Sequence, residues 1–360
     1  MNHAANTNAV VIGGRTIGPG QPVFVIAEAG VNHNGDVAVA QRLMEAARDC
    51  AVDSVKFQTF KAERVVTPAA PKAPYQLETT DPGESQIAML RALELDERAY
   101  PQLMAACRTA GLVFMSTPYN EEDIAFLVDL DVPALKLASI HAAEPSLLRA
   151  AALTGRPLIL STGMCTMDEV KRAVDIIHGA GNRNLIVLQC TTNYPSAVAD
   201  ANLKAMITMR DQLGVRVGYS DHTQTDTACI AAVALGACVI EKHFTLDKTM
   251  PGPDQPTSLE PAEMRALVRA LRDAESALGD GIKRPAPSEA RNTIGMRRGI
   301  VARHPIAKGQ RIAAADLILK RPLSEVPPSA WDKVVSSIAA RDIAAGVALT
   351  WADLQGGSSS

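Results

Sequence analysis

The sequence predicts an α/β protein in which a (β/α)8 barrel precedes a small β-rich C-terminal domain. The chain has 360 residues, which at about 100–200 residues per domain indicates two domains. Eight short apolar, β-rich segments alternate with segments of helical periodicity before residue 246. Short strands that alternate with helices indicate parallel βαβ units, and eight units in about 250 residues is the size of a (β/α)8 barrel.

The eight predicted strands are residues 24–30, 54–60, 112–118, 134–139, 158–164, 185–191, 216–222 and 239–245. Between them, residues 38–50 and 167–179 have apolar residues on one helical face, and Thr166 with Glu169 forms a capping box for the second of these helices. A doubly wound sheet is the alternative fold. No G-x-G-x-x-G follows the first strand, so the nucleotide-binding version of that fold is disfavoured.

A change in composition separates the two predicted domains. Residues 279–287 are rich in glycine, proline and charge, as expected of a linker. We expect the barrel at 10–280, the linker at 281–291 and the C-terminal domain at 292–354, with little helix. Residues 306–310 and 343–347 resemble each other, and each is followed by Ala-Asp-Leu, which indicates a weak internal duplication.

Composition and charge exclude several classes of protein. The formal net charge is −3, so there is no electrostatic footprint for nucleic acid. Residues 1–10 lack a signal peptide, and no apolar stretch approaches the roughly 20 residues that cross a membrane. The six cysteines form no C-x-x-C pair, which is typical of a reduced, cytoplasmic protein without structural zinc. Residues 356–360 are expected to form a flexible end.

Polar residues gather at the predicted strand ends, where barrel enzymes build their active sites. Lys56 and Gln58 share one strand face, as do Glu241 and His243, whereas Lys242 points the other way. Two inward lysines, Lys56 and Lys136, with hydroxyl groups nearby, suit a phosphate or a carboxylate. The alternative is that each lysine pairs with a neighbouring carboxylate.

Two histidines, His222 and His243, end neighbouring strands. Imidazoles at one level could hold a divalent metal and leave positions open for substrate oxygen. The alternative is that they are satisfied structural histidines. His33 is a weaker candidate, which we expect to cap or position a loop.

The motifs around these positions resemble the N-acetylneuraminate (sialic acid) synthase family from about residue 10 to residue 354. The C-terminal domain resembles the antifreeze-like (SAF) domain of that family, including Arg297-Arg298 and residues 320–322. The barrel motifs that carry the resemblance are residues 26–35, 55–59, 70–76, 84–86, 116–118, 161–164, 218–223, 241–248, 252–254 and 258–261.

The resemblance implies condensation of phosphoenolpyruvate (PEP) with an open-chain N-acylated hexosamine to a nine-carbon 2-keto-3-deoxy acid, with release of phosphate. His222 and His243 would bind Mn²⁺ or Mg²⁺, and Glu28 would manage a water or a proton. The implied catalytic residues are Glu28, Lys56, Lys136, His222 and His243. The implied PEP-binding residues are Lys56, Gln58, Thr117, Lys136, Ser139, Ser161 and Ser220.

For the sugar, the resemblance implies His141, Thr192, Tyr194, Asp254 and Arg321. Arg321 would reach in from the C-terminal domain of a partner subunit, which implies a domain-swapped homodimer.

Several sugar-facing positions depart from the family pattern, whereas the PEP and metal positions are kept. The family's Ser-Gly-Glu or Ser-Phe-Glu is Ser139-Ile140-His141 here, so an imidazole replaces a carboxylate. The segments 190–195, 255–256 and 323–325 also differ. We therefore hypothesise an unusual sugar acceptor, with neutral drift as the alternative.

Two other functions stay open at this point. A Schiff-base aldolase could use Lys136 or Lys56, and a non-catalytic sugar or phosphate sensor could have evolved from a synthase.

Overall fold

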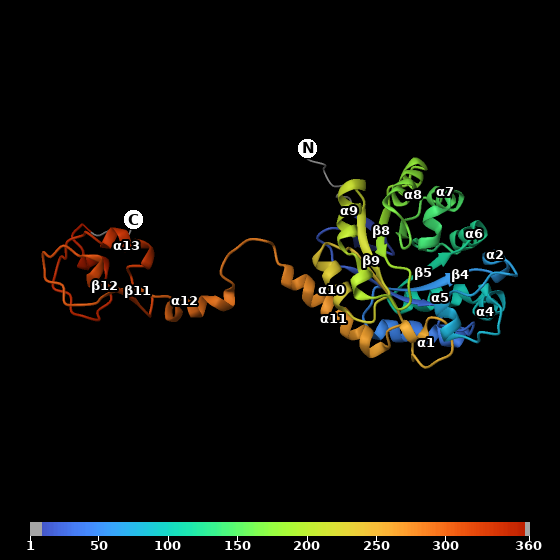
Figure 1. Cartoon of the computed structure of the whole chain (residues 1–360), viewed down its shortest axis with the longest axis horizontal. Coiled ribbons are helices and arrows are strands. Elements are labelled where there is room, and N and C mark those ends of the chain that lie inside the picture. The colour runs from blue at the N-terminus through green and yellow to red at the C-terminus, as the bar shows by residue number, and fades with distance from the viewer. Residues whose placement is uncertain (1–8, 357–360) are drawn as a thin grey trace. The chain divides into compact units, whose positions relative to one another are not determined.

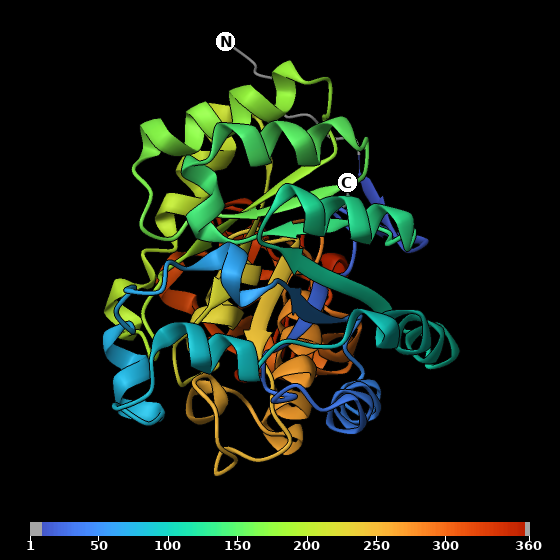
Figure 2. The ribbon, with the colours of Figure 1, turned by 90° about the vertical axis from the view of Figure 1, so that its right-hand side faces the viewer.

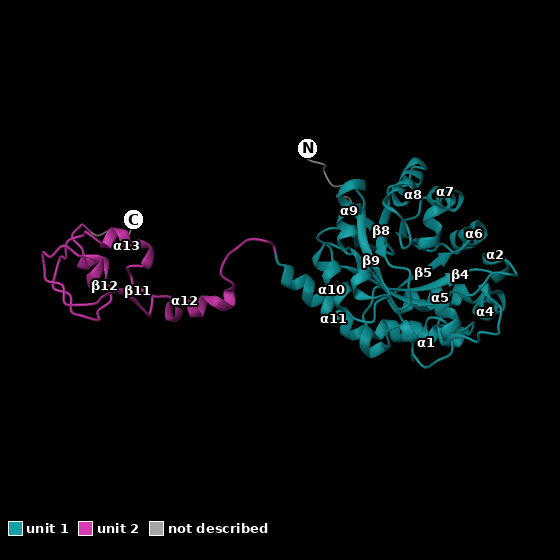
Figure 3. Cartoon of the chain, in the orientation of Figure 1, with its two compact units in different colours: residues 1–279 teal, residues 280–360 magenta. Residues whose placement is uncertain are grey.

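The computed structural model describes residues 9–356 and divides the chain into two compact units, Met1–Gly279 and Asp280–Ser360 (Figures 1 and 3). The described residues exclude residues 1–8 and 357–360. The prediction that residues 1–10 lack a signal peptide and the prediction of a flexible end at 356–360 therefore fall mostly outside them. Within residues 9–356, no helix is long and apolar enough to cross a membrane.

The first unit contains a sheet of eight parallel strands in the order β5-β4-β3-β10-β9-β8-β7-β6. The strands at the two ends of this order, β5 and β6, lie next to each other, so the sheet is a nearly closed barrel. The strands are β3 (Phe24–Gly30), β4 (Ser54–Thr59), β5 (Val113–Pro118), β6 (Leu135–Leu137), β7 (Leu158–Ser161), β8 (Leu185–Cys190), β9 (Arg216–Asp221) and β10 (Val239–His243). All eight predicted strands are present, and six of them end one to three residues earlier than predicted.

Helices follow the strands and cover the outside of the barrel (Figure 2). The predicted helix at 167–179 is confirmed, with the Thr166–Glu169 capping box. Three short helices between β4 and α5 were not predicted: α2 (Ala62–Val65), α3 (Pro74–Thr79) and α4 (Gln86–Ala92). The other helices are α1 (Val37–Asp49), α5 (Tyr100–Thr109), α6 (Glu121–Asp129), α7 (Pro145–Leu153), α8 (Met167–Gly179), α9 (Lys204–Leu213), α10 (Thr227–Ala234) and α11 (Pro261–Leu278), with 3-10 turns η1 (Glu97–Ala99), η2 (Ser139–Ala143), η3 (Val198–Ala201) and η4 (Gln255–Thr257).

The barrel interior has an apolar layer toward the amino ends of the strands. An antiparallel hairpin, β1 (Val10–Ile12) and β2 (Arg15–Ile17), packs against the inward side chains of this layer. Space there is tight at Gly218, because a Cβ atom would lie 2.5 Å from the Val239 carbonyl oxygen. The inward residues that join the hairpin in one core are Phe24, Ile26, Val113, Met115, Ala134, Ile159, Ile186, Leu188, Cys238 and Val239.

We expect the hairpin to contribute strongly to stability. Ile12 is 0% exposed, and Ile→Ala in a core commonly costs about 2–5 kcal/mol through lost burial and the cavity left behind. Ile12→Ala should therefore lower the urea midpoint of the barrel transition, measured by circular dichroism. The matched control is Val11→Ala in the same strand. Val11 is 56% exposed, so this change should cost about 0.5 kcal/mol or less. Equal effects of the two variants would contradict the role of the hairpin as a core element.

The second unit is small and has one antiparallel strand pair, β11 (Gly299–Ala302) with β12 (Leu317–Lys320). The end of the predicted linker is helical rather than irregular, because η5 (Pro287–Glu289) leads into α12 (Ala290–Met296). The other short helices are η6 (Ala314–Asp316), η7 (Pro328–Ala330), α13 (Trp331–Val334) and η8 (Trp351–Asp353).

The predicted duplication is visible in the second unit. Ile306 and Ile343, which begin the two similar segments, face each other in an antiparallel bridge. The Ala-Asp-Leu that follows each segment lies at a 3-10 turn with the same cap: Asp316 Oδ2 accepts from the backbone N–H of Ala313 at 2.9 Å, and Asp353 Oδ2 accepts from that of Thr350 at 2.7 Å.

Candidate active site

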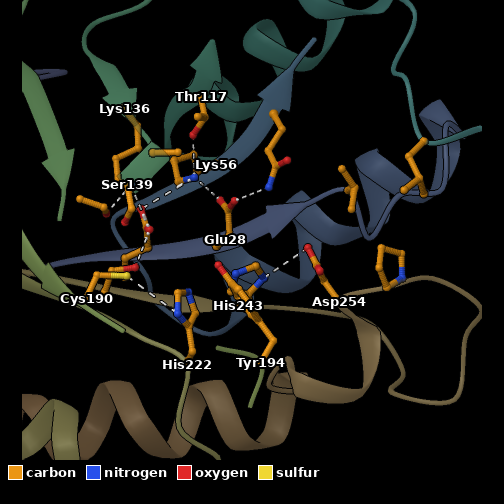
Figure 4. A pocket seen from close by; sticks show the side chains of 18 of the residues that line it. Glu28, Lys56, Thr117, Lys136, Ser139, Cys190, Tyr194, His222, His243 and Asp254 are labelled. Atoms are coloured by element: carbon orange, nitrogen blue, oxygen red, sulfur yellow. Dashed lines mark hydrogen bonds and ion pairs between the residues drawn. The ribbon is translucent and has the colours of Figure 1, made fainter. Parts of the chain in front are cut away.

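A cavity of about 160 Å³ opens at the carboxyl ends of the barrel strands (Figure 4). Alternate residues of a strand point inward, so the inward positions beyond the apolar layer reach this cavity. There the inward residues are polar. The strands contribute Glu28, Lys56, Gln58, Thr117, Lys136, Ser161, Cys190, Ser220, Glu241 and His243, and the segments after them contribute Tyr119, Ser139, Tyr194, His222 and Asp254.

Two buried lysines, Lys56 and Lys136, form one side of the cavity, the lysine floor. Lys56 Nζ lies 2.6 Å from Glu28 Oε2 and donates to Thr117 Oγ1 at 2.9 Å. Lys136 Nζ donates to Ser161 Oγ at 2.8 Å and lies 3.3 Å from Glu241 Oε1. The two lysines point inward together, as the prediction of an anion site requires. Each is also paired with a carboxylate, as the alternative interpretation requires.

Glu241 joins the two lysines and was not assigned a role from the sequence. Its Oε2 lies 3.8 Å from Lys56 Nζ, and its Oε1 accepts from Ser220 Oγ at 2.9 Å. Burial would raise the pKa of Glu241, but the charges of Lys136 and Lys56 outweigh burial and hold this pKa at about 2. Glu241 therefore keeps its negative charge throughout the neutral range.

Glu28 behaves differently, although it also touches a lysine. Burial raises the pKa of Glu28 to about 7, against the opposing effect of Lys56 and with a smaller upward effect of Glu241. The floor of the cavity thus contains one permanent carboxylate and one carboxylate that can exchange a proton near neutral pH.

The two histidines line the same cavity, and their ring centroids lie 5.3 Å apart. His222 Nδ1 lies 2.6 Å from the Thr191 carbonyl oxygen, so this nitrogen donates and leaves the other with a free lone pair. Burial, and then the charges of His222 and Lys56, lower the pKa of His243 well below its ordinary value. His243 Nδ1 is buried without a hydrogen bond and lies 3.9 Å from Asp254 Oδ2.

An imidazole nitrogen with a free lone pair is a suitable ligand for a divalent cation. Within residues 9–356, no group of three or more His, Cys, Asp or Glu side chains is arranged to hold a metal. His222 and His243 would supply two ligands of such a cation, and its other positions would be open to substrate oxygen or water.

The other side of the cavity is formed by the segment that contains α3 and α4, and by Tyr194 and Asp254. The Tyr75 and Tyr194 rings lie 5.0 Å apart, and Tyr194 also lies 4.1 Å from the His222 ring. Burial raises the pKa of Asp254 to about 6, against His222 and Lys56. Tyr75 and its neighbour Gln76 were not assigned as site residues, although the motif at 70–76 contains them.

Two predicted sugar-binding residues of the barrel, Thr192 and His141, are not among the side chains that line this cavity. Thr192 lies beside Gly163, where a Cβ atom would be 2.1 Å from Thr192 Oγ1. Arg321 is an exposed residue of the second unit, directly after β12. His141 is buried at the start of the segment after β6 and packs edge-on against Tyr119, with ring centroids 5.4 Å apart. Its Nδ1 lies 2.9 Å from Glu144 Oε2.

His33 is a buried loop residue, as expected. Its Nδ1 accepts from the backbone N–H of Gly35 at 3.0 Å, and burial lowers the pKa of its imidazole to about 4. It does not line the cavity.

The barrel places two buried lysines and two imidazoles around one cavity at the carboxyl ends of its strands. The chain belongs to the NeuB family, whose model matches residues 43–283, and a SAF domain model matches residues 297–355. N,N'-diacetyllegionaminic acid synthase of Legionella pneumophila is 42% identical over 97% of this chain and 99% of its own length. The same enzyme of Campylobacter jejuni is 42% identical over 89% of this chain and 96% of its own length. Among solved structures, N-acetylneuraminic acid (sialic acid) synthetase of Leptospira borgpetersenii in complex with citrate has a TM-score of 0.72 and 32% identity, covering 81% of this chain and 96% of that one.

Proposed function

We propose that this enzyme condenses PEP with an open-chain N-acylated hexosamine and releases phosphate, giving a nine-carbon 2-keto-3-deoxy acid. The observation that carries the proposal is the cavity itself, in which two buried lysines face two imidazoles. The proposal is also supported by 42% identity to two N,N'-diacetyllegionaminic acid synthases over nearly the whole chain.

The lysine floor suits the two anionic groups of PEP. Lys56 and Lys136 both line the cavity, and Thr117 and Ser161 lie within hydrogen-bond distance of their amino groups. Hydrogen bonds that involve a charged donor or acceptor are about twice as strong as hydrogen bonds between neutral groups. Gln58, Ser139 and Ser220 line the same floor and complete the proposed PEP contacts.

The metal is proposed to be Mn²⁺ or Mg²⁺ on His222 and His243. When bound, such a cation polarises the aldehyde oxygen of the acceptor. The residues of the chain hold PEP so that its C3 forms the new bond to C1 of the acceptor. Water adds to C2 of the PEP part, and Glu28 takes one proton from that water. The bond between C2 and the phosphate ester oxygen then breaks, phosphate leaves with the second proton of the water, and C2 becomes the ketone carbon. Glu28 releases its proton to solvent, and the former aldehyde oxygen takes up one proton from solvent and becomes a hydroxyl.

The acceptor side has an apolar wall. Val31, Met89, Leu90, Leu93 and Pro253 line it. Methyl groups bury favourably against such a wall, at about 25 cal/mol per Å², whereas a phosphate would lose its hydration there. We therefore propose a 2,4-diacetamido-trideoxy hexose as the acceptor.

The hypothesis of an unusual acceptor rests on His141 and is the alternative to this proposal. In this structure Tyr119 and Glu144 surround the ring of His141. A direct contact between His141 and the acceptor would require this packing to change.

The assembly and the location of the enzyme are also proposals. We propose a domain-swapped homodimer in which Arg321 of one subunit approaches the acceptor site of the other, with the family resemblance as support. All six cysteines are free, which suits the reducing cytoplasm.

The test is phosphate release by the full chain with PEP, Mn²⁺ and a set of sugars. The set contains N-acetylmannosamine, its 6-phosphate, 2,4-diacetamido-trideoxy sugars of manno and altro type, and non-acetylated and uronic analogues. Chelator-sensitive release that is fastest with a diacetamido-trideoxy sugar is the expected result. Fastest release with a non-acetylated or uronic sugar would support the His141 hypothesis. Chelator-resistant turnover with covalent trapping by borohydride would indicate a Schiff-base aldolase. PEP binding without release would point to an acceptor outside the set, and absence of PEP binding would favour a sensor.

Activity should depend on the protonation of Glu28. Because burial raises the pKa of Glu28 to about 7, its carboxylate, the form that accepts a proton, becomes more populated as pH rises. We expect kcat/KM for PEP, which reports the free enzyme, to rise with pH through about 7, and Glu28→Gln to be slow at every pH with this limb removed. A rising limb of unchanged midpoint in Glu28→Gln would show that another group is responsible.

A further inference from the structure

Behind the two histidines, on the outward side of the same two strands, lies a buried ion pair. Lys242 Nζ is 2.6 Å from Asp221 Oδ2, and the two side chains are 1% and 0% exposed. Asp221 directly precedes His222, and Lys242 directly precedes His243. Asp221 and Lys242 are also Cα partners in the pairing of β9 with β10. The ion pair therefore joins the two strands at the level of the two imidazoles.

The pair is tied as well to the loop that follows His222. Lys242 Nζ donates to the carbonyl oxygens of Thr223 and Thr225. Asp221 Oδ1 accepts from the backbone N–H of Thr223 at 2.9 Å and from the hydroxyl of Tyr219 at 3.0 Å. The residues on both sides of His222 are thus held by one network, so a shift of the network would tilt the imidazole.

Apolar residues at the positions of Asp221 and Lys242 could hold β9 and β10 together without a buried ion pair. Removing two ions from water costs several kcal/mol each, and well-packed apolar residues of similar volume are often as stabilising. The other outward residues of these strands, Val217, Tyr219 and Ile240, belong to the core between barrel and helices. In β9 and β10 the ionic pair replaces apolar packing at the level of the histidines.

We propose that the Asp221–Lys242 pair positions His222 and His243 for the divalent cation. This inference rests on the proposed function, which assigns the cation to these imidazoles. Side chains alternate between the two faces of a strand, so fixing the outward residue also fixes the direction of the inward residue after it. Asp221 and Lys242 are positioning residues, since neither lines the cavity.

The experiment measures metal binding rather than turnover. The full chain, freed of metal, is titrated with Mn²⁺, and free Mn²⁺ is followed by electron paramagnetic resonance. Asp221→Asn keeps the shape of the side chain and removes its charge. We expect its Kd for Mn²⁺ to rise by about 10–100-fold, the usual effect of losing a group that orients metal ligands. The affinity for PEP without metal, measured by calorimetry, should fall much less than the affinity for Mn²⁺, because Lys56 and Lys136 belong to β4 and β6 and only Ser220 of the proposed PEP contacts adjoins Asp221.

The matched control is Asp53→Asn at the opposite end of the barrel. Asp53 is also a buried carboxylate, which accepts from the backbone N–H of Val25 at 2.8 Å and pairs with Arg15 and Arg272. This variant should be less stable but should bind Mn²⁺ with the affinity of the unchanged protein.

A second variant covers the case in which Asp221→Asn does not fold. Asp221→Leu combined with Lys242→Met keeps apolar packing and leaves no unpaired charge. We expect it to fold and to bind Mn²⁺ as weakly as the single variant. The proposal is overturned if either folded variant binds Mn²⁺ with normal affinity, or loses PEP and Mn²⁺ affinity equally. If the unchanged protein binds neither Mn²⁺ nor Mg²⁺, the metal assignment of the proposed function fails first, and this inference fails with it.

Discussion

Replacing Lys136 with methionine is expected to lower kcat/KM for PEP by about 1000-fold. Lys136 Nζ touches Ser161 Oγ and lies 3.3 Å from Glu241 Oε1 in a buried site. The variant loses a charged partner for the substrate anion and leaves the Glu241 charge with Lys56 alone. Truncating one partner of a buried, hydrogen-bonded charge pair between two binding partners costs about 2–5 kcal/mol of binding, and each 1.36 kcal/mol lost from the stabilisation of the transition state is a factor of ten in kcat/KM. Initial rates of phosphate release at varied PEP measure the effect.

The control for this variant is a lysine in an exposed ion pair. Lys171 lies 2.7 Å from Asp175 on α8, and both side chains are about 60% exposed. Exposed pairs contribute about 0–1 kcal/mol, so Lys171→Met should change kcat/KM by less than about 2-fold. Thermal unfolding of both variants separates loss of function from loss of fold. If folded Lys136→Met kept its PEP affinity and turnover, the lysine floor would not be the PEP site.

Replacing His222 with alanine is expected to lower turnover by about 1000-fold or more, with no recovery in excess Mn²⁺. The ring of His222 is held by the Thr191 carbonyl oxygen at one nitrogen, which leaves the other for the cation. Loss of one of the two proposed protein ligands should abolish stable metal binding, and a Lewis acid contributes several kcal/mol to such chemistry. Chelation of the unchanged enzyme should have the same effect and should be reversed by added Mn²⁺ or Mg²⁺.

His178 provides the matched control, because it lies in the last turn of α8 and does not line the cavity. His178→Ala should keep its turnover and its response to chelator. Recovery of His222→Ala by excess metal would show that His243 and substrate suffice to hold the cation. Full activity of His222→Ala in chelator would rule out the metal-dependent reaction.

The strand alternation made much of the site predictable. Lys56, Lys136, His222 and His243 were expected to point into one barrel mouth, and all four line the cavity. Lys242 was expected to point away from Glu241 and His243, and it pairs with Asp221 on the outward side. These predictions succeeded because the direction of a strand side chain follows from local backbone geometry with a period of two.

The contacts across the cavity were harder to predict. Glu241 was expected to share a face with His243, but its place between two lysines from the distant strands β4 and β6 was not. The helices α3 and α4 were not predicted either, since each has fewer than eight residues and such short helices depend on packing rather than on propensity. Tyr75 and Gln76 reach the cavity from this segment.

The sequence by itself determined the order of the strands and helices, the side of each strand that faces inward, and the polar character of the strand ends. These properties depend on near neighbours in the chain. Only the tertiary structure decided which polar ends meet, that Glu241 bridges Lys56 and Lys136, and that His141 packs behind Tyr119. The physical reason is that such contacts depend on how strands distant in sequence are staggered around the barrel, which no local pattern encodes.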